Sequence, residues 1–219
     1  MSSPIVVYGS GGSGREVAWL AEQCGREVVG FIDDDLSTIG RTVNDLPVLS
    51  IASAKETFPD LEVALGIGNA AARGRAAAQA IRHRLPFATL VHPGVVKSRW
   101  VTIGTGCIIC AGSIVTTNVV IGDYVQVNIA CTISHDVELG ELVTLAPGVH
   151  ISGTVTIGAR AFLGTGANII NGTPESPLTI GSDAIIGAGA CVIGSVDAGA
   201  MVVGVPARPI KVPAPVARR

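Results

Sequence analysis

The chain has 219 residues, of which 28 are glycine, while only 4% are aromatic and 15% are charged. Its 15 Lys and Arg residues are balanced by 17 Asp and Glu residues, which excludes the strong attraction to a phosphate backbone that nucleic-acid binding requires. The mean hydropathy is +0.53, yet no uninterrupted apolar run reaches the roughly eighteen residues of a membrane-spanning helix. The N-terminus has neither a basic start nor an apolar stretch long enough for secretion. We therefore expect a cytoplasmic protein that neither binds nucleic acid nor inserts into a membrane.

The first 92 residues are expected to form a small α/β domain with a Rossmann-like parallel sheet. An apolar segment at residues 5–8 precedes a glycine-rich turn and a helix over residues 15–23, which is the order of elements in a nucleotide-binding unit. Further strands are expected at residues 28–32, 63–67 and 87–91, and a further helix at 69–84. Alternating strands and helices predict a parallel sheet, and His92, Pro93 and Gly94 are expected to turn the chain out of it.

The glycine-rich turn is a candidate phosphate site. Gly9, Gly11 and Gly14 have the GxGxxG spacing, and Asp33 follows Gly14 by nineteen residues, a pattern that by itself indicates NAD. However, ninety residues are only about half of a two-lobed dinucleotide domain, and bare N–H groups at a helix N-terminus suit any pyrophosphate. We favour a nucleotide-linked sugar over NAD, and either ligand over a tight turn that binds nothing.

The predicted nucleotide site consists of the turn and the acidic residues after the second strand, namely Gly9, Gly11, Gly12, Ser13, Gly14, Asp33 and Asp34. At the carboxyl end of a strand, the two aspartates are placed to accept hydrogen bonds from a ribose or a base. A solvated acidic turn explains them equally well.

A repeat of six residues follows. From Ile103 to Ile169 an aliphatic residue recurs at every sixth position, and after a slip of five residues at 173–177 the pattern resumes and continues to Val192. This period matches neither the 3.6-residue repeat of a helix nor the alternation of a simple strand, and is typical of a hexapeptide parallel β-helix. Twelve repeats before the slip and three after it, fifteen in all, predict five triangular coils within residues 93–203.

Two segments lie outside the regular repeat. Residues 173–177 read Thr-Pro-Glu-Ser-Pro, which is typical loop chemistry, so we expect them to leave the wall of the β-helix as a loop. Residues 204–219 are rich in proline and end in two arginines, and are expected to form a wrapping or loose tail.

His135 and Asp136 are the candidate catalytic pair. Ile133 is predicted to point inward, which places the next two outward residues, His135 and Asp136, at a corner where a small residue often stands in other repeats. Histidine is the commonest general base, and a neighbouring carboxylate orients it and stabilises its protonated form. The alternative is a solvent-exposed turn histidine. Zinc is rejected, because three imidazoles are needed and the repeat region offers only His135 and His150.

The five cysteines are Cys24, Cys107, Cys110, Cys131 and Cys191. An odd, scattered set is typical of reduced thiols rather than of a disulfide framework. Cys107 and Cys110 form one CxxC pair, but a metal site normally needs a second pair. We expect both to be small wall residues and predict no metal.

Four motifs follow one another within residues 4–209: GSGGSGREV at 9–17, FIDDD at 31–35, the hexapeptide array with Asn128 seven residues before His135, and GVPA at 204–207. Together they resemble the bacterial sugar acetyltransferases that are grouped with sialic acid O-acetyltransferases. This group includes enzymes that N-acetylate nucleotide-linked 4-amino-4,6-dideoxy sugars. The resemblance implies a homotrimer of left-handed β-helices, with acetyl-CoA between neighbouring prisms and the nucleotide in the N-terminal domain.

The resemblance also implies roles for single residues. His135 matches the catalytic base, Asp136 the acidic residue after it, and Asn128 a substrate-contacting asparagine. The positions that match the lining of the coenzyme A groove are Thr144, Gly153, Thr165 and Ala188. Thr144 stands where some N-acetylating members have a second histidine near the thioester, and Ser13-Gly14-Arg15 replaces their Gly-His-Gly-Lys variant of the loop.

The sequence therefore predicts an acetyl-CoA-dependent N-acetyltransferase of nucleotide-linked amino sugars, in which His135 acts as general base in a ternary complex. One alternative is O-acetylation of sialic acid or another sugar. A second is an NAD-binding protein or a trimeric binding protein without catalysis.

Overall fold

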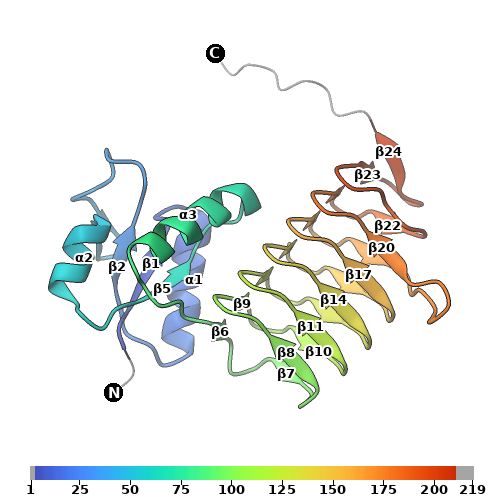
Figure 1. Ribbon diagram of the computed structural model, residues 1–219, viewed down its shortest axis with the longest axis horizontal. Coiled ribbons are helices and arrows are strands. Elements are labelled where there is room, and N and C mark those ends of the chain that lie inside the picture. The colour runs from blue at the N-terminus through green and yellow to red at the C-terminus, as the bar shows by residue number, and fades with distance from the viewer. Residues whose placement is uncertain (1–2, 211–219) are drawn as a thin grey trace.

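The computed structural model describes residues 3–210 and consists of an α/β domain and a β-helix (Figure 1). The part of the tail beyond Ile210, residues 211–219, lies outside the described residues. None of the helices within residues 3–210 combines the length and the apolar character needed to cross a membrane.

The N-terminal domain is built on a five-stranded sheet with the order β3-β4-β2-β1-β5. Four strands are parallel and β3 is antiparallel to β4. The strands are β1 (Ile5–Tyr8), β2 (Val28–Ile32), β3 (Thr42–Val43), β4 (Leu46–Leu49) and β5 (Glu62–Leu65), and the helices are α1 (Gly12–Gln23), α2 (Ile51–Thr57) and α3 (Ala70–Arg82).

Helices cover both faces of this sheet. Ile5 and Val7 pack in one apolar cluster with α1, whereas Val6 and Tyr8 pack in another with α2 and α3. Side chains alternate between the faces of a strand, so a strand that is covered on both sides reads as a continuous apolar run. That is why the strands at 5–8 and 28–32 were predictable from the sequence, and both are confirmed.

Two features of this domain differ from the prediction. The short strands β3 and β4 and helix α2 were not anticipated. The expected strand at 87–91 was wrong as a strand of this sheet, because only Phe87 bridges to it, at Val63. Strand β6 (Leu90–Val91) pairs instead with β9 (Ile108–Ile109), so the chain enters the β-helix before the expected turn at His92.

The second part is a left-handed parallel β-helix with three sheets. Sheet 1 contains β6, β9, β12 (Gln126–Val127), β15 (Thr144–Leu145), β18 (Phe162–Leu163), β21 (Ile185–Ile186), β23 (Met201–Val203) and the antiparallel β24 (Arg208–Ile210). Sheet 2 contains β7 (Val96–Lys97), β10 (Ile114–Val115), β13 (Thr132–Ile133), β16 (His150–Ile151), β19 (Asn168–Ile169) and β22 (Cys191–Val192). Sheet 3 contains β8 (Val101–Ile103), β11 (Val119–Ile121), β14 (Val137–Leu139), β17 (Val155–Ile157) and β20 (Leu178–Ile180).

The predicted aliphatic positions form the core of this β-helix. Ile133 and Ile151, for example, are at most 1% exposed and stack in neighbouring strands of sheet 2. The coils approach so closely at the corners that a Cβ on Gly140 would lie 2.7 Å from the backbone nitrogen of Ala159. Glycine at such corners is therefore a packing requirement.

The array is longer than the five predicted coils. Strands β6 and β7 precede Ile103, and β23 follows Val192. The first coil was not recognised in the sequence, because Lys97 stands at a position that is aliphatic in the other repeats. The loop at 173–177 is confirmed, since it leaves the wall between β19 and β20 and is closed by backbone hydrogen bonds between Thr173 and Ser176.

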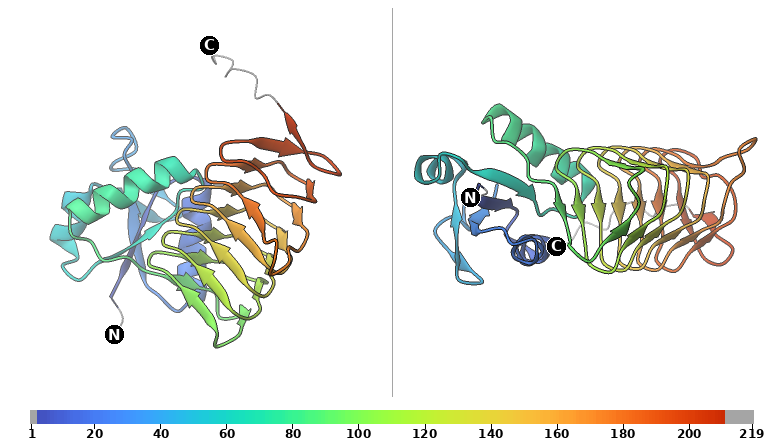
Figure 2. Two further views of the ribbon diagram at one scale, coloured as in Figure 1. Left: turned by 45° about the vertical axis from the view of Figure 1, so that its right-hand side comes forward. Right: turned by 90° about the horizontal axis from the view of Figure 1, so that it is seen from below.

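The N-terminal domain lies beside the β-helix (Figure 2) and contacts it along sheet 1. Leu90 and Ile108 of this sheet share an apolar cluster with Leu20 of α1. On the other side of the domain, Phe87 and Tyr124 make an edge-to-face ring contact with centroids 4.9 Å apart. The corner between sheets 2 and 3 is consequently the corner opposite the docked domain.

Candidate active site

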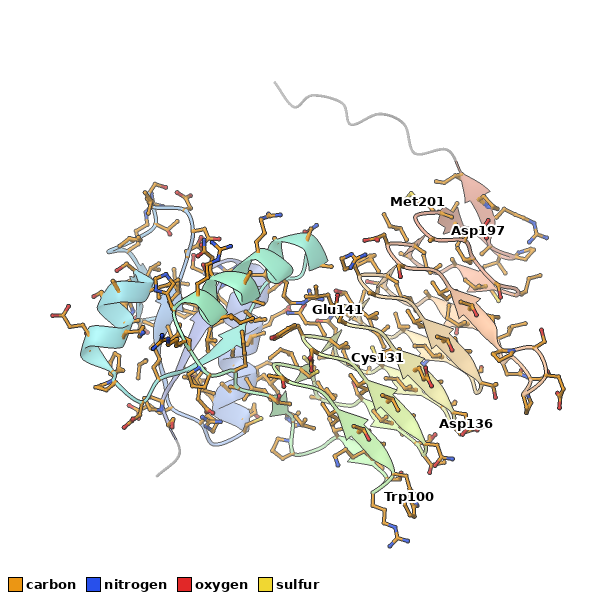
Figure 3. The ribbon with its side chains drawn as sticks, viewed as in Figure 1. Trp100, Cys131, Asp136, Glu141, Asp197 and Met201 are labelled. Atoms are coloured by element: carbon orange, nitrogen blue, oxygen red, sulfur yellow. The ribbon has the colours of Figure 1, made fainter. Side chains whose placement is uncertain are left out.

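His135 lies at this opposite corner, in the turn between β13 and β14. The pairing of sheet 2 aligns Val115, Ile133, Ile151, Ile169 and Val192. The residues two positions further on therefore form one column along the corner, which we call the His135 column: Thr117, His135, Gly153, Asn171 and Gly194. Figure 3 shows the neighbouring Asp136 on the side of the β-helix away from the N-terminal domain.

The histidine and the aspartate form a hydrogen-bonded pair. Nδ1 of His135 lies 2.8 Å from Oδ2 of Asp136, and the two side chains are 59% and 51% exposed. The other carboxylate oxygen accepts a hydrogen bond of 3.1 Å from Nδ2 of Asn118, one coil earlier. The bonds from His135 and Asn118 hold the pKa of Asp136 below its usual range, so this carboxylate is ionised at neutral pH.

This arrangement assigns the two ring nitrogens of His135. An ionised carboxylate only accepts hydrogen bonds, so Nδ1 carries the proton that it donates to Asp136. In the neutral ring, Nε2 is then the basic nitrogen. The side chain is more than half exposed, so the imidazole can be reached by a substrate that binds from outside the prism. The corner thus has the chemistry of a general base with an orienting carboxylate.

The glycine-rich turn forms a second site on the N-terminal domain. Gly9 has a φ of +105°, and a Cβ on Gly14 would lie 1.8 Å from the carbonyl oxygen of Gly9, so only glycine allows this entry into α1. The N-cap residue Gly11 has no side chain to cap the helix. The first N–H groups of α1 are therefore left for a ligand, which is the usual anion site of a helix.

A cavity of about 350 Å³ opens at this turn, and we call it the nucleotide pocket after the ligand that the sequence predicts for it. The turn and the start of α3 converge on it, and its walls include all the predicted residues except Gly14: Gly9, Gly11, Gly12, Ser13, Asp33 and Asp34, with Tyr8, Gly66, Ile67, Gly68 and Ala72. Gly14 lies behind the wall of this pocket, where the absence of a side chain lets the backbone of Gly9 approach α1 closely.

The two aspartates of the nucleotide pocket are held differently. Asp33 accepts hydrogen bonds from the backbone N–H of Ser10 at 2.9 Å and from its hydroxyl. Burial alone would raise the pKa of Asp33, but these bonds outweigh burial and lower it. Asp34 accepts a hydrogen bond from the hydroxyl of Tyr8. Both carboxylates are therefore fixed in place, where they can accept hydrogen bonds from a ribose or a base.

Asn128 lies in a smaller, mostly apolar cavity of about 100 Å³ between α1 and the β-helix. The α1 side is formed by Glu16, Trp19, Leu20 and Gln23, and the β-helix side by His92, Cys110, Ala111, Asn128, Ile129 and Pro147. Glu16, Trp19 and Gln23 share one face of α1 with Gly12, because they follow it by four, seven and eleven residues. An extended ligand that binds in the nucleotide pocket can therefore reach along α1 to Asn128.

The predicted coenzyme positions do not come together in one chain. Gly153 belongs to the His135 column, directly beside the imidazole. Thr165 and Ala188 are exposed in successive coils at the other edge of sheet 2, where the N–H of Gly189 bonds the carbonyl of Thr165 at 2.8 Å.

The structure places Thr144 at the junction between the two domains. This residue is only 3% exposed, and its hydroxyl accepts a hydrogen bond of 2.9 Å from Arg73 and donates one of 3.3 Å to the carbonyl of Gly68. Because α3 docks over this part of sheet 1, Thr144 is buried between the two domains. It does not line a groove on the surface of the β-helix.

Three residues of these sites were missed by the sequence reasoning, namely Tyr8, Asn118 and Arg73. Asn118 precedes Asp136 by eighteen residues, which is one coil, so stacking the sequence in rows of eighteen would have paired them. The role of Arg73 could not be seen in the sequence, because its partners outside the nearby residues 67 and 68 come from two distant segments of the chain, around Tyr124 and Leu142.

The cysteines are free, and two of them pack in the apolar core of the β-helix. Cys107 and Cys131 are fully buried and face the interior of the β-helix, and all five cysteines are free thiols. Within residues 3–210, no three His, Cys, Asp or Glu side chains are grouped as a metal site would require.

A β-helix of six-residue repeats with a histidine and aspartate pair at one corner, joined to a glycine-turn domain, defines a hexapeptide-repeat acyltransferase. A family model described as the PglD N-terminal domain matches residues 4–80. The GDP-perosamine N-acetyltransferase of Escherichia coli O157:H7 is 37% identical over 212 residues, which are 94% of this chain and 95% of that protein. The chain therefore belongs to the family of bacterial sugar N-acetyltransferases that includes this enzyme.

Solved structures agree with this assignment. WeeI from Acinetobacter baumannii AYE is 36% identical with a TM-score of 0.89, over 95% of this chain and all of that one. PerB from Caulobacter crescentus, solved with CoA and GDP-perosamine, is 30% identical with a TM-score of 0.85, over 95% and 98% of the two chains. The acetyltransferase domain of PglB from Neisseria gonorrhoeae FA1090, solved with acetyl coenzyme A, is 31% identical with a TM-score of 0.84, over 96% of this chain and all of that one.

Proposed function

We propose that this protein transfers the acetyl group of acetyl-CoA to the amino group of a nucleotide-linked 4-amino-4,6-dideoxy sugar in bacterial glycan synthesis. The observation that carries the proposal is the pair formed by the exposed imidazole of His135 and the carboxylate of Asp136, which leaves Nε2 as the basic nitrogen. The family membership of the chain supports the same reaction. GDP-perosamine is the first acceptor to test, because a relative of 37% identity is named for it. The five free thiols suit a cytoplasmic enzyme.

The nucleotide pocket would hold the nucleotide diphosphate. The start of α1 offers N–H groups to the phosphates, and Asp33 and Asp34 offer carboxylate oxygens to the ribose and base. The sugar would then extend along α1 toward Asn128. The apolar lining of that cavity suits the methyl group of a 6-deoxy sugar.

The reaction would proceed by direct transfer in a ternary complex. The sugar amine attacks the carbonyl carbon of the thioester while Nε2 of His135 takes a proton from the amine. The ionised Asp136 stabilises the imidazolium that forms, and backbone N–H groups of the β-helix wall stabilise the oxyanion. The C–S bond then breaks, and the coenzyme A thiolate takes the proton from His135. Nitrogen is acetylated, one thiol is released, and the imidazole is neutral again.

We further propose that the working enzyme is a homotrimer whose active sites lie between copies. The nucleotide pocket belongs to a domain docked on sheet 1, whereas His135 lies at the opposite corner of the prism, between β13 and β14. A sugar held by one chain is therefore remote from the His135 of the same chain, and a neighbouring copy would supply the base. Closed rotational assemblies are the common way to repeat such a contact. Sedimentation of the protein as a monomer at assay concentration would contradict this arrangement.

The test is thiol release from acetyl-CoA with GDP-perosamine, UDP- and dTDP-linked 4-amino sugars, and free and CMP-linked sialic acids. We expect turnover with an amino sugar, and a loss on the order of 10²–10⁴ in kcat for His135→Ala. His150→Ala is the matched control, because His150 is an exposed histidine on β16 whose partner is Thr132. Turnover with sialic acids alone would indicate O-acetylation. Full activity of His135→Ala would overturn the mechanism.

A further inference from the structure

Arg73 is a fully buried cation in the first turn of α3, where the N-terminal domain meets the β-helix. Burial lowers the pKa of its guanidinium to about 10, so the group stays charged at neutral pH. Within residues 3–210, no carboxylate pairs with it. A buried charge without a counter-ion is unfavourable unless its hydrogen bonds are satisfied.

The partners of Arg73 are neutral oxygens from both domains. On the side of the N-terminal domain, Nη1 donates to the carbonyls of Ile67 at 2.8 Å and Gly68 at 3.0 Å. Both residues belong to the wall of the nucleotide pocket. On the side of the β-helix, Nε donates to the carbonyl of Tyr124 at 2.9 Å, and Nη2 donates to the carbonyl of Leu142 at 2.7 Å.

Two outward side chains of sheet 1 complete the junction. Gln126 accepts from Nη1 of Arg73 at 3.2 Å, and its own Nε2 donates to the carbonyl of Leu65 at 2.9 Å. The hydroxyl of Thr144 accepts from Nη2 at 2.9 Å and donates to the carbonyl of Gly68 at 3.3 Å. The segment from the end of β5 to the pocket wall is thus bonded to two successive coils of the β-helix.

We propose that Arg73 is a positioning residue for the nucleotide sugar: it fixes the Ile67 and Gly68 wall of the nucleotide pocket relative to the β-helix. The proposal rests on the function proposed above. Apolar side chains would join two domains at least as strongly as a buried charge does. The planar guanidinium differs from apolar side chains because its five N–H groups lie in fixed directions. It therefore holds the surrounding oxygens, and the two segments that carry them, in one arrangement.

The test compares Arg73→Met, Arg73→Lys and Thr144→Val with the full-length protein. Arg160→Met is the matched control, because Arg160 stands at the same corner of the β-helix as Leu142, one coil further on, and bonds only Asp183 and Glu141. Binding of GDP, UDP and dTDP is measured by calorimetry. The KM values for GDP-perosamine, or for the acceptor that is turned over, and for acetyl-CoA are measured by thiol release.

We expect Arg73→Met to weaken nucleotide binding and raise the KM for the nucleotide sugar by about tenfold or more. The KM for acetyl-CoA should stay within about twofold, because Gly153, Thr165 and Ala188 stand at other corners of the prism. Arg73→Lys should recover part of the loss, since a point charge satisfies fewer of the oxygens. Thr144→Val should show a smaller loss of the same kind, and Arg160→Met none.

Three results would count against the proposal. Unchanged nucleotide binding by a folded Arg73→Met protein would overturn it, and so would an equal rise in both KM values, which would indicate a general loss of structure. If Arg73→Met does not fold, unchanged nucleotide binding by both Arg73→Lys and Thr144→Val would overturn it. Failure of the wild-type protein to bind any of the three nucleotides would instead overturn the proposed function, and this inference with it.

Discussion

The imidazole of His135 occupies the space in which a side chain at Gly153 would lie. A Cβ built on Gly153 would come within 2.4 Å of Cε1 and 2.6 Å of Nε2 of His135. Gly153 follows His135 by one coil in the same column, so the glycine leaves the room in which the ring sits. Asp136 fixes one edge of the ring and Gly153 lets it lie close to the wall.

We predict that Gly153→Ala lowers kcat on the order of 10²-fold, because the added methyl group displaces the base from its place and small misplacements of a catalytic group are that costly. The KM for the nucleotide sugar should change little. Gly194→Ala is the control, since Gly194 belongs to the same column and a Cβ there would meet nothing within 4 Å. The measurement is the steady-state kinetics of the two variants. Equal kcat values for Gly153→Ala and Gly194→Ala would contradict the prediction, because they would show that displacing the ring does not slow the reaction.

Because of Tyr8, we expect the protein to lose thermal stability at alkaline pH. Burial, and then the hydrogen bond to Asp34, raises the pKa of Tyr8 well above that of an ordinary tyrosine. A raised folded-state pKa gives a contribution to stability that is complete below about pH 10 and is lost as the pH rises above it, because the unfolded chain loses the proton first. The Tm of the wild type should therefore fall more steeply between about pH 9 and pH 11 than the Tm of Tyr8→Phe. Parallel curves would contradict the prediction.

Removal of residues 173–177 should leave the β-helix intact. A Cβ on Gly172 would lie 2.4 Å from the backbone nitrogen of Leu178, so the ends of the loop already meet, and loop length has only a weak effect on stability. We expect the Tm to change by less than about 4 °C.

The same deletion should raise the KM for acetyl-CoA. Ser176 and Pro177 border a cavity of about 200 Å³ beside Asn171, in the His135 column, so the loop extends the wall next to the corner that carries His135. Thermal unfolding and thiol-release kinetics of the deletion variant are the measurements. An unchanged KM would show that the loop takes no part in donor binding.

The thiols of Cys107, Cys110 and Cys131 should resist alkylation in the native protein. Burial raises the pKa of Cys107 and Cys131 to about 11 and that of Cys110 to about 12, and only the thiolate reacts. Iodoacetamide at neutral pH should leave these three residues unmodified until a denaturant is added. Peptide mass spectrometry before and after denaturation checks this, and rapid native labelling of any of the three would contradict it.

Much of the β-helix was predictable because each coil repeats the same inward position within a few residues of sequence. The period of six identified Ile133 as a core residue and so placed His135 and Asp136 at a corner. The partners that complete the corner, Asn118 and Gly153, lie one coil away, and the period of six alone does not single them out.

The junction between the domains was not predictable in the same way. An outward position such as Thr144 has the same local pattern whether solvent, a ligand or another domain covers it, and the docking of α3 decides between these cases. The early coil at Lys97 was missed for a different reason. The repeat is broken there by a charged residue, and only the pairing of β7 with β10 restores it.

The residues of the His135 column are regularly spaced along the axis of the β-helix. Each coil contacts only its neighbours, and neighbouring strands are about 4.8 Å apart, so Gly194 lies three coils, or about 14 Å, beyond His135 along the axis. Inserting or removing one whole coil past Gly153 would change that span by one step without touching the base, its carboxylate or the nucleotide pocket. Under the proposed function, the length of the surface that a donor would contact can therefore be changed independently of the chemistry at its reactive end.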